Sequence, residues 1–204
     1  AHYNLGVLHE RQAAREGESA EGQRHTAEAL KAYSRAAEPS SYPKALTNLG
    51  FMHARRGGNE GEAEAMDCFR RAAEQGEANA QANLGSLYYT AGDEAAAAHW
   101  WLKAATAGHV KGQLNLASLF LQGRGGLAED GKEAARWLHR AAAQGSEQAL
   151  RSLHALLADP AVYFALADND DGDDDDAHSM KDVPLGRRYL ASVYYAAETL
   201  TTVG

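Results

Sequence analysis

The feature that most constrains the fold of this chain is a short apolar phrase that it contains four times. The copies are NLGVLHE (Asn4–Glu10), NLGFMHA (Asn48–Ala54), NLGSLYY (Asn83–Tyr89) and NLASLFL (Asn115–Leu121). A weaker fifth copy lies in 146–157, with Leu153 in the place of the shared leucine. Recurrence of one phrase every few tens of residues is the signature of a repeat protein, in which each copy is one structural unit.

A second phrase follows each of the four strong copies. Its versions are ALKAYSRAA (Ala29–Ala37), AMDCFRRAA (Ala65–Ala73), AHWWLKAA (Ala98–Ala105) and EAARWLHRAA (Glu133–Ala142). Three of them run into a glycine at a fixed distance, namely Gly76, Gly108 and Gly145. Because glycine is favoured just after the end of a helix, each unit is predicted to be a first helix, a loop, a second helix and a glycine turn.

The residue after the shared leucine is small in every strong copy: Gly6, Gly50, Gly85 and Ala117. A glycine inside a helix costs about 1 kcal/mol relative to alanine, so its recurrence predicts that another helix approaches closely. The Ala-Ala pairs of the second phrase are predicted to supply the matching small surface. A single helix pair cannot bury its apolar side alone, whereas stacked pairs can share a continuous core.

The order of these slots resembles the Sel-one-like repeat (SLR) family, a relative of the tetratricopeptide repeat. The fourth unit, Gly112–Gly145, shows the pattern most completely. The resemblance implies an all-α fold: a right-handed α-α superhelix (solenoid) of about five helix-turn-helix repeats. The expected units are 1–40, 41–76, 77–108, 109–145 and a partial 146–157. Residues 158–204 are expected to form a degenerate last repeat or capping helices around an acidic loop, 168–176.

Charge and hydropathy narrow the choice of partners. The net charge of −8 falls to −1 when the seven aspartates of 168–176 are left out. A nearly neutral body argues against a nucleic-acid surface. No apolar run approaches the roughly 20 residues of a membrane-spanning helix, so no direct membrane insertion is predicted. The aspartate run lacks the first aspartate and the final glutamate of a calcium loop and is predicted to be a solvated loop; the alternatives are docking to a basic partner and loose binding of a divalent cation.

No pattern in the sequence predicts a catalytic, cofactor or metal site. The nine histidines form no HxxxH or HExxH pair, and His9 and His53 fall in a slot that later copies fill with Tyr88 and Phe120. Cys68 takes the slot of Trp100 and is predicted to be a packed thiol. GRGG (Gly123–Gly126) follows a predicted helix rather than a strand and lacks the GK[ST] of a phosphate loop.

The remaining candidate site is a surface for other proteins. Two slots of the first helix vary between copies, two and five residues after the shared leucine, and are predicted to face the concave side of the superhelix. The predicted partner-binding residues from these slots are Phe51, Ser86, Tyr89, Ser118 and Leu121; Val7, Glu10 and Ala54 share the slots. The alternative is that these side chains contact the next helix pair.

The function predicted is a non-enzymatic scaffold or adaptor that holds partner proteins on its concave face. Two alternatives are a structural subunit of a large, organellar assembly and the adaptor of an ER-associated degradation ubiquitin-ligase complex, which the family resemblance implies. An enzyme with a site composed across repeats is disfavoured because no nucleophile–base pair can be named. The chain is expected to be a fragment of a longer intracellular protein, in the cytosol, an organelle interior or the ER lumen.

Overall fold

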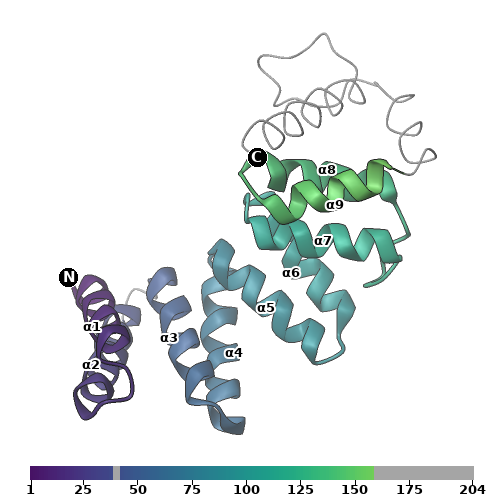
Figure 1. The fold of residues 1–204 in the computed structure, drawn as a ribbon. Coiled ribbons are helices and arrows are strands. Elements are labelled where there is room, and N and C mark those ends of the chain that lie inside the picture. Colours follow the sequence, from purple (N-terminus) through teal and green to yellow (C-terminus); the bar gives the residue numbers. More distant parts are fainter. Residues whose placement is uncertain (39–41, 159–204) are drawn as a thin grey trace, which may run out of the picture.

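The structure, a computed structural model, describes residues 1–38 and 42–158, and these form nine α-helices and no strand. The helices are α1 (His2–Glu16), α2 (Ala20–Ala37), α3 (Pro43–Arg56), α4 (Gly58–Glu74), α5 (Ala78–Thr90), α6 (Glu94–Thr106), α7 (Val110–Gln122), α8 (Gly131–Ala143) and α9 (Glu147–Leu157). They stack in order as the pairs α1–α2, α3–α4, α5–α6 and α7–α8, and α9 packs on α8 at the end of the described chain (Figure 1). The predicted solenoid is confirmed. The expected capping helices and acidic loop fall in 159–204, outside the described residues.

Within a pair, an aromatic ring of the second helix lies against the glycine of the first. A Cβ added at Gly6, Gly50 or Gly85 would come within 2.5–2.8 Å of a ring atom. The rings belong to Tyr33, Phe69 and Trp101 respectively. The close approach predicted for these glycines is therefore present, but the expected partner was wrong: an aromatic side chain fills the space, and not an Ala-Ala pair.

The Ala-Ala pairs instead pack against the next repeat. Ala72 and Ala73 at the end of α4 share a buried cluster with Leu84 of α5. Further along, a Cβ at Gly112 of α7 would stand 2.8 Å from the Cβ of Ala104 in α6. The small pairs thus let the first helix of each new unit approach the end of the preceding second helix.

Consecutive repeats are joined by the predicted glycine turn. Gly76, Gly108 and Gly145 have φ values of 84°, 83° and 85°, in the left-handed region that favours glycine. The residue after each glycine donates its N–H to the carbonyl of the residue five positions earlier, as in Glu77 N to Ala72 O at 3.2 Å, which is the Schellman arrangement. That same residue caps the next helix: the side chains of Glu77, His109 and Ser146 accept from N–H groups three residues on.

Two buried glutamines tie these junctions together. Gln81 and Gln113 each donate from Nε2 to a carbonyl at the end of the preceding helix, Ala73 O at 3.1 Å and Ala105 O at 3.2 Å. Helix ends leave carbonyls without intrahelical partners, and a buried carbonyl without a hydrogen bond is costly. The glutamines therefore satisfy groups that the stacking of repeats would otherwise bury unpaired.

Candidate partner-binding face

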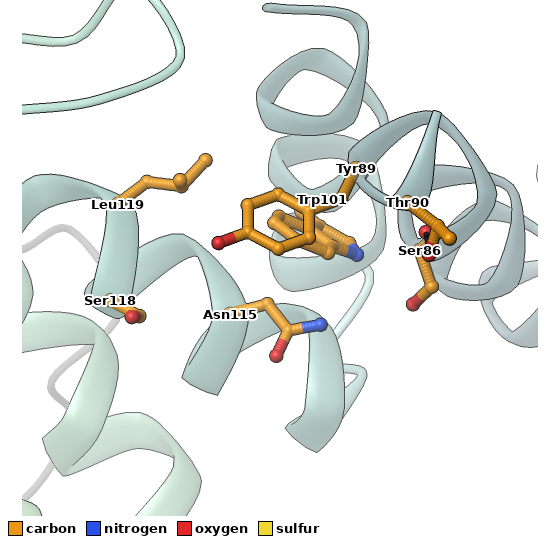
Figure 2. A pocket seen from close by; sticks show the side chains of 7 residues that line it. All are labelled: Ser86, Tyr89, Thr90, Trp101, Asn115, Ser118 and Leu119. Atoms are coloured by element: carbon orange, nitrogen blue, oxygen red, sulfur yellow. Dashed lines mark hydrogen bonds between the residues drawn. The ribbon is translucent and has the colours of Figure 1, made fainter. Parts of the chain in front are cut away.

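A pocket opens between the first helices of two adjacent pairs, α5 and α7, with one wall from α6. It encloses about 250 Å³. The lining side chains, drawn in Figure 2, are Ser86, Tyr89, Thr90, Trp101, Asn115, Ser118 and Leu119. Aromatic and aliphatic groups are thus placed beside hydroxyl and carboxamide groups in a single hollow, a combination typical of sites that bind a peptide or small polar ligand.

Two aromatic rings form the apolar wall of the pocket. The centroids of Tyr89 and Trp101 lie 5.3 Å apart with their planes at 39°. Trp101 is buried, and its Nε1–H donates to the carbonyl of Ala82 at 3.2 Å. Because the indole is held by both packing and a hydrogen bond, Tyr89 rests on a fixed surface.

The exposed side of Tyr89 is held by Arg124, which lies in the loop between α7 and α8. The Arg124 guanidinium lies 5.5 Å from the tyrosine ring centroid, and its Nη1–H donates to the phenol oxygen at 3.1 Å. Glu94 of α6 accepts two hydrogen bonds from the same guanidinium and so fixes its orientation. The hydrogen bond to Glu94 and the charge of its carboxylate raise the pKa of Arg124.

The polar side of the pocket includes an unused hydrogen-bonding group. Asn115 is half-buried, and no other described side chain or backbone group hydrogen-bonds to its carboxamide. Ser86 and Ser118 lie nearby in Figure 2, and each hydroxyl oxygen can still accept. A carboxamide offers one acceptor and two donors, so this pocket can bond to a group that presents both a C=O and an N–H.

The structure brings together three of the five predicted partner-binding residues, since Ser86, Tyr89 and Ser118 all line this pocket. Phe51 is 43% exposed and stacks edge-on against Phe69, with ring centroids 5.2 Å apart. Leu121 is exposed on α7 but does not line the pocket. The five residues therefore lie on the first helices of the pairs, and only three share one hollow.

Sequence reasoning missed the other four residues that line the pocket, Thr90, Trp101, Asn115 and Leu119, and also Arg124 beside it. Asn115 recurs as Asn4, Asn48 and Asn83 just before each shared leucine, and that repetition of a polar residue beside a core position was an available signal. Arg124 had no such signal, because its contact with Tyr89 joins residues far apart in the sequence.

The histidines in the predicted packing slot have polar partners on the second helix of their own pair. The Nδ1 atoms of His9 and His25 lie 3.0 Å apart, so one ring donates to the other. Nδ1 of His53 lies 2.7 Å from a carboxylate oxygen of Glu64. Among residues 1–38 and 42–158, no group of three or more metal-binding side chains is present. These histidines therefore link paired helices.

Cys68 is buried in the core between α2, α3 and α4. Burial first, and then the nearby Asp67 carboxylate, raise the pKa of its thiol to about 11. A thiol in this environment has little nucleophilic character, in agreement with the prediction that it serves in packing.

Several adjacent arginines are neutralised by neighbouring acids. Arg70 and Arg71 both pair with Asp67, and Arg56 pairs with Glu64.

In the described part of the chain, no helix is long and apolar enough to cross a membrane.

A stack of helix pairs of this kind defines an α-solenoid repeat protein. Residues 43–77, 78–109 and 110–146, just over half of the chain, match the Sel1 repeat. The chain belongs to the Sel1 repeat family. Sel1 repeats generally serve as protein–protein interaction scaffolds and are generally non-enzymatic.

Two solved structures have a similar fold. A protective antigen of uropathogenic Escherichia coli with an SLR fold is 30% identical, with a TM-score of 0.65, over 81% of this chain and 33% of that chain. A Sel1 repeat protein from Oxalobacter formigenes is 23% identical, with a TM-score of 0.60, over 94% of this chain and 69% of that chain. This chain thus spans about a third of the first of these proteins. No curated protein sequence matches it.

Proposed function

We propose that this chain is a scaffold that binds a partner protein along the face formed by the first helices of its pairs, with the pocket between α5 and α7 as the central contact. The observation that carries this proposal is the half-buried Asn115 carboxamide, which has no hydrogen-bonding partner among the described residues, beside the aromatic wall of Tyr89 and Trp101. The carboxamide is free to hydrogen-bond to a ligand, and the two rings offer apolar surface beside it.

The chemistry of the pocket favours a peptide segment. A peptide unit offers both a C=O and an N–H and so matches the Asn115 carboxamide in both directions. An apolar side chain next to that unit would contact Tyr89 and Leu119, which lie on the same hollow. Tyrosine and tryptophan are favoured at protein interfaces because they combine a large apolar area with a polar tip.

The experiment compares proteins captured by the wild type with those captured by two variants, Asn115→Ala and Tyr89→Ala. Captured proteins are quantified by mass spectrometry and their affinities are then measured singly by calorimetry. A direct partner should bind each variant at least about 10-fold more weakly, which is the loss of roughly 1.4 kcal/mol. The matched control is Leu102→Ala, an exposed leucine of α6 that does not line the pocket.

Circular dichroism must show the same helical content for all the variants. Equal affinity of a purified partner for the wild type and both pocket variants would exclude this pocket as the contact. If capture yields a stoichiometric complex that covers the Leu102 side as well, the chain is instead a structural subunit of that assembly.

A further inference from the structure

The two helices of each pair differ in charge. Helices α3, α5 and α7 contain no aspartate or glutamate, whereas each second helix from α2 to α8 contains at least one. The lysines and arginines of these three first helices are Lys44, Arg55, Arg56 and Lys111. Of these four, only Arg56 forms an ion pair with a described residue, Glu64 of α4. The first helices therefore carry positive charge that the described part of the chain does not neutralise.

A second hollow adjoins the pocket between α5 and α7. It lies between α7 and the start of α9, beside the end of α8, and has a volume of about 810 Å³. We call it the α7–α9 hollow. Asn115 lines both hollows, so a bound segment that bonds to this carboxamide can place one side chain against the aromatic wall and a neighbouring one in the α7–α9 hollow.

The charge of the two hollows comes from one lysine. Among the described residues that line them, Lys111 is the only lysine or arginine, and none has a carboxylate. Lys111 is exposed, as is Gln148 on the same hollow, and neither side chain has a bonding partner among the described residues. The acids at two neighbouring helix starts are already engaged. Glu77 accepts three hydrogen bonds from α3 and α5, and Glu147 lies 3.6 Å from Arg151 of its own helix.

We propose that the segment bound between α5 and α7 is an acidic peptide, in which a carboxylate next to the apolar anchor pairs with Lys111 in the α7–α9 hollow. This inference rests on the proposed function, which supplies the apolar anchor and the bond to Asn115. One oxygen of the carboxylate accepts from Lys111 Nζ, and the Gln148 carboxamide can donate to the other. Opposite charges across an interface speed the encounter and select among partners.

The same features favour a peptide over a nucleic acid. Nucleic acids bind through several phosphate contacts to lysines and arginines, and a single lysine lines these hollows. The pocket between α5 and α7 has an apolar wall that includes Leu119, which suits an aliphatic side chain.

The test compares two heptapeptides, GDDLDDG and GNNLNNG, both acetylated and amidated so that their ends carry no charge. Each reads the same in either direction, so the orientation of the bound segment does not have to be known. They are titrated into the isotope-labelled chain, and binding is followed by NMR shifts of the backbone amides. At low salt, GDDLDDG should bind at least about 5-fold more tightly, with the largest shifts in α5, α7 and the start of α9. The difference should shrink as salt is raised, because salt screens exposed charges.

Three variants assign the preference to one side chain. Lys111→Gln should weaken the binding of GDDLDDG by about 3-fold or more and leave that of GNNLNNG unchanged, whereas Lys111→Arg should keep the preference. The matched control is Lys31→Gln, which removes the same charge from an exposed lysine of α2 that lines neither hollow and should change neither affinity. Asn115→Ala should weaken both peptides, because it acts on the bond that they share.

The outcomes separate this inference from the proposed function. Equal affinity for the two peptides, lost for both in Asn115→Ala, would overturn the acidic partner and leave the pocket as the contact. A preference for aspartate that survives Lys111→Gln would also overturn it, since the charge would then be read elsewhere. So would a short oligothymidylate that binds more tightly than GDDLDDG and is weakened by Lys111→Gln. If neither peptide binds, the inference fails, and the capture experiment with Asn115→Ala and Tyr89→Ala still decides the proposed function.

Discussion

The indole ring of Trp101 lies directly on the backbone of Gly85. A Cβ added at residue 85 would stand 2.5 Å from Cδ1 and 2.7 Å from Nε1 of that ring, much closer than a carbon atom can approach. Tyr33 on Gly6 and Phe69 on Gly50 repeat the arrangement. In the fourth pair, Ala117 stands in the glycine slot and Leu138 in the aromatic slot. Alanine is larger than glycine and leucine is smaller than tryptophan, so the two changes compensate each other in volume.

Gly85→Ala should therefore destabilise the protein, although alanine is the better helix former. Forcing a methyl group into a packed core costs about 1–3 kcal/mol, against a gain of about 1 kcal/mol in helix propensity. We expect a net loss of roughly 1–2 kcal/mol in the free energy of unfolding. Urea unfolding followed by circular dichroism measures it.

The control for this prediction copies the fourth pair. In a Trp101→Leu background, Gly85→Ala should cost much less or become stabilising, because leucine leaves the space that Leu138 leaves beside Ala117. If the alanine costs the same in both backgrounds, then the ring is not the cause of the glycine requirement.

The repeated phrases were enough to predict the helix pairs and their stacking, because periodic leucines and glycine turns are local signals. They also indicated that Gly85 is approached closely. They did not indicate that the ring of Trp101 is the group that contacts Gly85. The ring and the Ala-Ala pair lie on the same second helix, and the packing angle between the helices determines which of the two faces the glycine. Helix spacing alone does not settle that angle.

The candidate site was predictable to a similar degree. Variation between copies indicated Ser86, Tyr89 and Ser118, which line the pocket. The contact between Tyr89 and Arg124 depends on the path of the loop after α7, including two glycines with positive φ, Gly125 and Gly126. Glycine loops tolerate many paths, and so their sequence does not specify which side chain they deliver to a neighbouring helix.

A prediction about the pocket follows from that contact. Arg124→Ala should release the ring of Tyr89 while leaving thermal unfolding nearly unchanged, because the Arg124 side chain is exposed. The measurement is the NMR signal of the Tyr89 ring, assigned with Tyr89→Phe, which should shift and sharpen. Arg124→Lys should behave like the alanine variant, since lysine lacks the planar fork that binds Glu94 and Tyr89 together. An unchanged Tyr89 signal in both variants would contradict the proposed role of Arg124.

The stability of the α6–α7 junction should depend on pH through His109. Its Nδ1 accepts from Gly112 N–H at 3.2 Å, and Nε2 lies 3.1 Å from the Asn79 side-chain oxygen, so the ring is neutral with its proton on Nε2. Burial, with a smaller contribution from Lys111, lowers the pKa of His109, while Glu77 opposes the change. A proton on Nδ1 would remove the helix cap.

The direction of this effect follows from proton uptake. Below the ordinary histidine pKa of about 6.5, the unfolded chain binds a proton that folded His109 resists, so the stabilisation present above that pH is lost as the pH falls. His109→Ser keeps a capping side chain, as Ser146 does at the next junction, but cannot titrate. The difference in Tm between the wild type and His109→Ser should therefore change between pH 7.5 and pH 5, to the disadvantage of the wild type. A constant difference would show that His109 does not titrate with folding.

Cys68 should be inert in the folded protein. Its side chain is buried, and the thiol pKa of about 11 means that roughly one molecule in a thousand carries a thiolate at pH 8, the form that reacts. A chromogenic disulfide reagent at pH 8 should therefore label the native chain only as fast as the core opens, and label it at once in urea. Cys68→Ala should be tolerated with a loss of about 1 kcal/mol, since Ala32 holds the same slot in the first pair. Rapid labelling without denaturant would mean that α4 separates from its neighbours far more readily than a stack held by Leu49 and Phe69 allows.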